Sequence, residues 1–165
     1  MLDTPRFTQG QLSGLRRIFH RMNHLMVFMW KIGLGGMLNA WPAVGGRIMV
    51  IKHRGRRSGK VYLTPVNYAI VNDEIYCTAG FGEKTDWYRN VLANPTVELW
   101  LPQGRRRAQG SDASASPERV QLLRQVLIAS GFAGPLFGVD PRKLADNQLA
   151  EIARDYRLVH FSMEA

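Results

Sequence analysis

The fold is decided by three consecutive stretches, RIMVIK (residues 47–52), VYLTPVNYAIV (61–71) and EIYCT (74–78). All three are rich in β-branched and aromatic residues, which is typical of strands. The segments between them, 54–60 and 72–73, contain glycine, serine, asparagine and aspartate, which favour chain reversal. The sequence therefore predicts a meander of three antiparallel strands. Pro65, inside the second strand, indicates an edge, a bulge or backbone that faces a ligand.

Further elements are expected on the C-terminal side of this meander. Strands are predicted at 96–101, at 105–111 after a turn at Gly104, and at 156–163, where side chains alternate in character. Thr85 has the position of an N-cap for a helix at 86–92, which Asn94-Pro95 ends. Two more helices are predicted, from Ser116-Pro117 to about residue 130 and from Asp140-Pro141 to about 154. The fold class is therefore mainly β with α, a small barrel of about six antiparallel strands with helices at both ends.

The N-terminal region is interpreted as a tail over 1–10 and an amphipathic helix over 12–34, with apolar residues three and four apart and basic residues between them. The helix either packs on the domain with a solvated basic face or lies on an anionic membrane surface. Lysine, glycine and proline interrupt the apolar stretch 25–43, so we do not expect it to span a membrane. We expect one domain over 1–165, made of the tail and helix (1–44) and the barrel with its inserted and C-terminal helices (45–165).

Charge and cysteine content limit the function classes. The formal charge is +9, from 22 Lys and Arg against 13 Asp and Glu, which attracts phosphorylated small molecules, nucleic acid or acidic lipid. Cys77 is the only cysteine, so an internal disulfide is excluded, and its place in a strand indicates a buried hydrophobe. With no secretory signal evident, we expect a cytoplasmic protein. His20 and His24 lack a third ligand nearby, so no metal site is expected.

Two segments carry candidate chemistry. The segment RGRRSGK (54–60), which we call the basic turn, sets guanidinium groups and a serine hydroxyl among glycines, as phosphate binding requires. A solvated hairpin turn is its alternative. In GFGEKTDWYRN (80–90), a glycine loop meets a helix N-terminus, and Trp87 and Tyr88 offer flat surfaces for stacking a ring. Here the alternative is that Trp87 is a core residue and Asn90 a cap.

Together, GRRSG (55–59), PVNY (65–68), GFG (80–82) and WYRNVLANPTV (87–97) resemble the deazaflavin-dependent nitroreductase family over residues 45–102. The resemblance implies a split β-barrel related to FMN-binding oxidases, with coenzyme F420, or alternatively FMN, as the cofactor. It implies hydride transfer to an electron-poor small-molecule acceptor such as a quinone or nitroaromatic. The implied cofactor residues are Arg56, Arg57, Ser58, Gly59 and Lys60 at the anionic tail, Pro65, Val66 and Asn67 along the ring, and Thr78, Gly80, Phe81, Gly82, Trp87 and Asn90 closing the site. Tyr68 is the candidate catalytic proton donor, with a packing role as its alternative.

The resemblance also implies a homodimer and peripheral contact of residues 12–34 with the inner face of the membrane. Tyr62 stands where many members have arginine, and Gly80-Phe81 where many have Ser-Lys. Lys60, Lys84 and Arg54 are the candidates to replace these two cations; the alternatives are that the bound species is a smaller flavin or that the cofactor role is lost. The other function class is a non-catalytic basic barrel that binds anionic lipid or nucleic acid, to which Arg105–Arg107 would contribute. Nucleic acid is not expected, because exposed aromatic residues do not alternate on consecutive strands, as base stacking requires.

Overall fold

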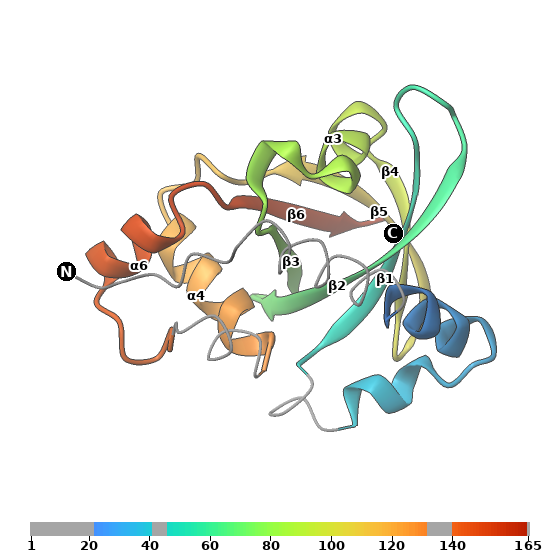
Figure 1. Ribbon diagram of the computed structural model, residues 1–165, viewed down its shortest axis with the longest axis horizontal. Helices are drawn as coiled ribbons and strands as arrows, with labels where there is room; N and C mark the ends of the chain where they lie inside the picture. The colour runs from blue at the N-terminus through green and yellow to red at the C-terminus, as the bar shows by residue number, and fades with distance from the viewer. Residues whose placement is uncertain (1–21, 41–45, 132–139, 165) are drawn as a thin grey trace, which may run out of the picture.

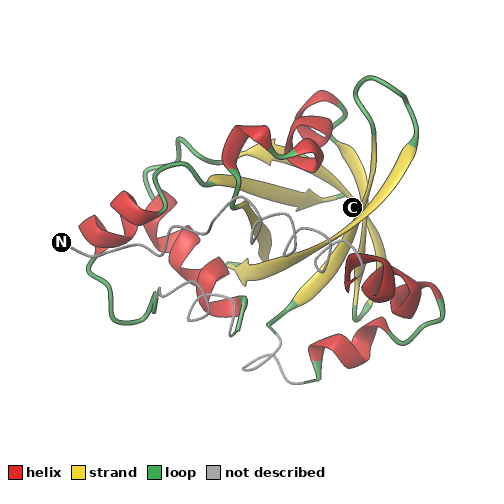
Figure 2. Cartoon of the chain, viewed as in Figure 1, coloured by secondary structure: helices red, strands yellow, loops and turns green. Residues whose placement is uncertain are grey.

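A computed structural model describes residues 22–40, 46–131 and 140–164 (Figures 1 and 2). Its strands form a closed antiparallel barrel in the order β1-β2-β3-β6-β5-β4. Their bounds are β1 (Ile48–Arg54), β2 (Val61–Val71), β3 (Glu74–Ala79), β4 (Thr96–Leu101), β5 (Gly104–Asp112) and β6 (Arg157–Met163). The predicted split β-barrel of about six antiparallel strands is confirmed.

The helices cover the barrel from three directions (Figure 1). A 3-10 helix, η2 (Gly82–Lys84), and α3 (Asp86–Ala93) are inserted between β3 and β4. Between β5 and β6 the chain forms α4 (Arg119–Ala129) and α6 (Asp146–Ile152), which lie together at one end of the barrel. Residues 22–31 are helical and precede the 3-10 helix η1 (Gly35–Asn39).

The turn between β2 and β3 lies at Asn72-Asp73, as predicted. Asn72 and Asp73 have φ values of 52° and 64°, the left-handed conformation that a two-residue hairpin loop requires. β2 pairs with β1 over residues 61–67 and with β3 over residues 68–71. Pro65 therefore lies in the half of β2 that pairs, among the described residues, with β1 alone. Its missing N–H removes no hydrogen bond to a strand on the other side.

The core fills the barrel and continues under two of its covers. Met49, Ile51 and Phe161 are fully buried inside the barrel, and so is Cys77, which confirms its prediction as a buried hydrophobe. Burial raises the pKa of the Cys77 thiol. A second cluster packs α4 and α6 on the outside of β2 and β6 through Leu122, Leu123, Val126, Ala69, Ala153 and Leu158. A third joins Trp30 of the N-terminal helix to Val50 and Trp100.

Three predicted elements need correction. The C-terminal helix begins at Asp146 and not at Asp140, because residues 141–143 form a turn. Thr85 has the N-cap position of α3, but its hydroxyl makes no capping bond. The N-terminal helix ends at residue 31, ahead of a turn in which Gly33 has a φ of +83°. The expected tail and the first part of that helix, 12–21, lie outside the described residues. No helix in the described part of the chain has the length and apolar character to cross a membrane.

Candidate functional site

The basic turn is held against α3 by the side chain of Asn90. Oδ1 of Asn90 accepts hydrogen bonds from the backbone N–H of Arg56 at 3.1 Å and from Nη1 of Arg56 at 2.9 Å. One turn earlier on the same face of α3, Oδ1 of Asp86 accepts from both Nη1 and Nη2 of Arg56 at 3.1 Å. Asn90 is 6% exposed and Asp86 is largely exposed. The buried amide therefore fixes the turn, and the exposed carboxylate adds a solvent-screened ion pair.

A cleft of about 600 Å³ opens between the basic turn, β2, α3 and the N-terminal helix. It brings together five of the residues predicted from sequence, Arg56, Arg57, Ser58, Trp87 and Asn90. The remaining lining residues are Asn23, His53, Gly55, Tyr62, Thr64 and Asp86. The two segments with candidate chemistry, 54–60 and 80–90, thus meet at a single cavity.

The basic turn keeps cationic and hydroxyl groups at the cleft. Among the described residues, no carboxylate lies within ion-pair distance of Arg57 or Lys60, and both are exposed. The Ser58 Oγ accepts from the Lys60 backbone N–H at 3.3 Å and lies 3.3 Å from the Tyr62 hydroxyl. A Cβ at Gly55 would lie 2.7 Å from the Ser58 Oγ, so a side chain at that position would displace it. Glycine at this position therefore leaves room for the hydroxyl of Ser58 and the ring of Tyr62.

His53 lies in the part of the cleft nearest the barrel interior. Its Nε2 is 3.0 Å from Oγ1 of Thr64, and its ring stacks on Tyr62 with centroids 5.8 Å apart. The ring is 3% exposed, and no side chain among the described residues forms a hydrogen bond with Nδ1. Burial lowers the pKa of His53 to about 4, against a smaller opposing effect of the Arg54 backbone. His53 is therefore neutral at pH 7.

The other residues predicted for the site do not line this cleft. Pro65, Val66 and Asn67 lie further along β2, where Val66 packs on the core and the Asn67 amide donates to the Arg47 carbonyl at 3.2 Å. Tyr68 is 2% exposed in the core, and burial raises the pKa of its hydroxyl while Arg47 acts in the opposite direction. Gly59 and Lys60 complete the basic turn. Thr78 lies near the end of β3, Gly80 and Phe81 follow it, and Gly82 begins η2. Contact of these residues with a ligand stays a prediction.

Sequence reasoning did not assign His53, Thr64 and Asp86 to the site. A signal for His53 was present, because Met49 and Ile51 precede it at the spacing of one strand face, where a third apolar residue is expected. Asp86 was interpreted only as a helix start, since the sequence does not show that it faces the basic turn.

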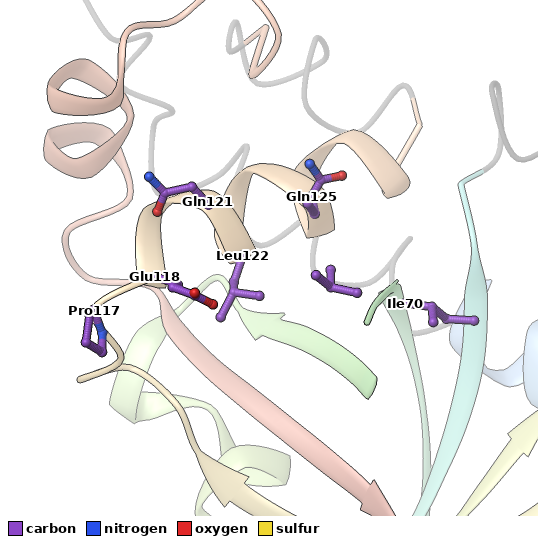
Figure 3. A pocket seen from close by; sticks show the side chains of 7 residues that line it. Ile70, Pro117, Glu118, Gln121, Leu122 and Gln125 are labelled. Atoms are coloured by element: carbon purple, nitrogen blue, oxygen red, sulfur yellow. The ribbon is translucent and has the colours of Figure 1, made fainter. Parts of the chain in front are cut away.

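A second pocket, of about 560 Å³, lies between α4 and the end of β2 (Figure 3). Its polar groups are the carboxylate of Glu118 and the amides of Gln121 and Gln125, beside apolar Ile70 and Leu122. It has no basic lining residue, so it offers an anionic ligand no charge partner. The cleft at the basic turn is the better candidate.

Comparison with known proteins identifies the family of the chain. Residues 24–131 match the family model described as F420H(2)-dependent quinone reductase. A Mycobacterium tuberculosis protein described as a candidate F420H(2)-dependent quinone reductase is 32% identical over 77 residues, or 45% of this chain. The chain spans 64% of the length of that relative.

Two solved structures show likeness of the fold alone. A candidate 5-nitroimidazole antibiotic resistance protein from Bacteroides thetaiotaomicron has a TM-score of 0.54 at 12% identity, covering 73% of this chain and 74% of that one. A candidate pyridoxamine 5'-phosphate oxidase from Listeria innocua has a TM-score of 0.51 at 9% identity, covering 72% and 85%. Because the family model matches well over half of the chain, the protein belongs to the F420H(2)-dependent quinone reductase family.

Proposed function

We propose that this protein is an oxidoreductase that binds coenzyme F420 in the cleft beside the basic turn and transfers hydride to an electron-poor acceptor such as a quinone. The observation that carries the proposal is that Arg57 and Ser58 line the same cavity as Trp87. Asn90 holds the turn that contains Arg57 and Ser58 in place. Membership of the family supports the choice of cofactor. An FMN-binding reductase on the same site is the alternative.

The chemistry of the cleft fits a ligand with an anionic tail and a flat ring. Arg57, Ser58 and Lys60 would hold phosphate or carboxylate oxygens through charge-assisted hydrogen bonds. Arg56 would contribute less to binding an anion, because its guanidinium already forms an ion pair with Asp86. The indole of Trp87, which is partly buried against the core, supplies a flat surface for a ring.

When bound, the deazaflavin supplies the hydride, and the protein supplies binding, orientation and exclusion of water. Asn90 orients the turn that would bind the tail, and neutral His53 places no charge beside the ring. Reduction of a quinone by hydride also requires a proton. Tyr68 is the proposed donor; it is 2% exposed in the core and does not line the cleft, so its alternative is a packing role. If Tyr68 donates the proton, Tyr68→Phe slows turnover more than it weakens cofactor binding, whereas equal losses would refute the donor role.

Titration with oxidised cofactors tests the proposal. We expect saturable quenching of F420 fluorescence by the purified protein, weaker binding of FMN, and about a tenfold loss of F420 affinity in Arg57→Ala. Arg105→Ala is the matched control, since Arg105 lies over Trp100 on the outer side of the barrel. Reduced F420 with a soluble quinone should then show protein-dependent reoxidation. Tighter binding of FMN would overturn the cofactor, and binding of neither would overturn the oxidoreductase.

We also propose that the N-terminal helix contacts a membrane, where hydrophobic quinones are dissolved. Trp30 packs one face of residues 22–31 on the barrel, while Met22, Leu25, Phe28 and Ile32 follow at spacings of three and four and are 39–59% exposed. Asn23 of this helix lines the cleft, so an acceptor in the membrane would lie near the site. Such a face suits an interfacial helix beside basic residues.

Sedimentation with phospholipid vesicles tests this contact. Wild-type protein should co-sediment with anionic vesicles, and the double variant Leu25→Ser, Phe28→Ser should remain in the supernatant. Ile152→Ser, a change at a comparably exposed apolar residue on α6, should behave as wild type. Equal binding of all three proteins would refute a membrane role for this helix.

A further inference from the structure

We propose that His53 is a positioning residue that, through its hydrogen bond to Thr64, sets the orientation of the Thr64 hydroxyl for the polar edge of a ring bound in the cleft. The inference rests on the proposed function and adds a determinant of ring recognition that is separate from the cationic groups of the basic turn. It assigns contact with the ligand to Thr64 and an indirect role to His53.

His53 occupies a position on the inward face of β1 where the fold otherwise places apolar side chains. Met49 and Ile51 are fully buried, and His53 is the next residue on the same face of β1. The register pairs Ile51 with Thr64 and His53 with Tyr62, so His53 and Thr64 are diagonal neighbours on one face of the sheet. An apolar side chain would suit this place in the fold, so the presence of imidazole calls for a separate reason.

The hydrogen bonds of His53 supply that reason. Nε2 contacts Thr64 Oγ1 at 3.0 Å, whereas no side chain in the part of the chain that the structure describes forms a hydrogen bond with Nδ1. The fold therefore keeps a buried polar ring whose single side-chain hydrogen bond goes to a residue that lines the cleft. Tyr62 stacks on the same ring and separates it from solvent.

The Thr64 hydroxyl has hydrogen-bonding capacity to spare in either tautomer of His53. If Nε2 accepts the Thr64 proton, the oxygen lone pairs are left for an N–H of the ligand. If Nε2–H donates, the Thr64 O–H is left for a ring carbonyl. Flavins and deazaflavins present both kinds of group on the pyrimidine edge of the ring. A neutral imidazole thus selects the direction of one hydroxyl without adding charge.

The test measures the affinity for oxidised F420, with FMN as a second flavin, in single and double variants. His53→Leu and Thr64→Val should each weaken binding about tenfold. The double variant should bind as tightly as the single variant with the lower affinity, because both changes affect the same hydroxyl. His53→Gln and Thr64→Ser, which keep hydrogen-bonding groups, should restore most of the affinity. Ile51→Val, a change in the neighbouring core residue, is the control and should bind as wild type.

A second readout needs no cofactor. In ¹⁵N-histidine-labelled protein, Thr64→Val should shift the Nε2 resonance of His53, which the His53→Gln spectrum identifies. Additive losses, or loss in Thr64→Val without loss in His53→Leu, would overturn the positioning role. If His53→Leu does not fold, the His53→Gln and Thr64→Val proteins decide the question with the same criteria. If the wild-type protein binds F420 or FMN and all variants bind equally well, this inference alone is overturned. If the wild-type protein binds neither cofactor, the proposed function is overturned as well.

Discussion

Replacing Asn90 by alanine should release the basic turn from α3. The substitution removes the acceptor for two hydrogen bonds, one from the Arg56 backbone N–H and one from its guanidinium. A neutral hydrogen bond contributes about 0.5–1.5 kcal/mol and one to a charged group about 1.5–3 kcal/mol, so the free energy of unfolding should fall by roughly 2–4 kcal/mol. The cofactor affinity should fall with it, because the groups that bind the tail are no longer held in place.

Urea denaturation followed by circular dichroism measures the first effect. With an m value of about 2 kcal/mol/M, the midpoint should move down by about 1–2 M while m stays unchanged. Asp86→Ala is the matched control on the same helix face, and it removes only an ion pair to a largely exposed carboxylate. Its cost should be under about 1 kcal/mol. If Asn90→Ala costs no more than Asp86→Ala, the basic turn is not held by Asn90 and the account of the site is wrong.

Three further predictions concern single residues. Asp86→Asn should tighten F420 binding, because it frees Arg56 and removes a negative charge beside the cleft, and the gain should shrink in high salt. Since the pKa of His53 falls to about 4 on folding, the unfolded chain alone takes up a proton as the pH drops from 6.5 to 4. The protein should therefore lose up to about 3 kcal/mol of stability across that window, a loss that His53→Gln removes in pH-dependent urea titrations. Gly82→Ala should lower the thermal midpoint by several degrees, because Gly82 has a φ of +61° and a Cβ would lie 2.4 Å from the Asp155 carbonyl oxygen, whereas Gly59→Ala, with open space around it, should cost less.

The strands could be predicted because their signals are local. Alternation of side chains and the Asn72-Asp73 turn determine the meander without reference to distant residues. The C-terminal helix was placed wrongly because a distant residue decides its start. The guanidinium of Arg124 donates to the backbone carbonyls of Pro141 and Leu144, and Oδ1 of Asp140 accepts from the Arg142 N–H. These bonds hold the segment as a turn, and the part that Arg124 plays in it is not visible in the sequence of the segment itself.

The same distinction applies to the site. The basic turn and the Trp87 segment each have a local composition that suggests ligand binding, and both line the cleft. The pairing of Arg56 with Asp86 and Asn90 joins residues 30 and 34 positions apart, so composition could not show it. His53 was not assigned to the site from the sequence, and its hydrogen bond to Thr64 becomes visible only when the strand register is known.

The connection between Arg56 and Asn90 also ties ligand binding to the integrity of the whole barrel. The basic turn connects β1 to β2. Helix α3 precedes β4, and β4 closes the barrel by pairing with β1. An unfolded chain therefore has no cleft, and cofactor that binds only the folded protein shifts the folding equilibrium toward the folded state. At a free cofactor concentration of 100 times Kd this linkage contributes about 2.7 kcal/mol, so cells that produce more cofactor should also contain a longer-lived, more protease-resistant protein.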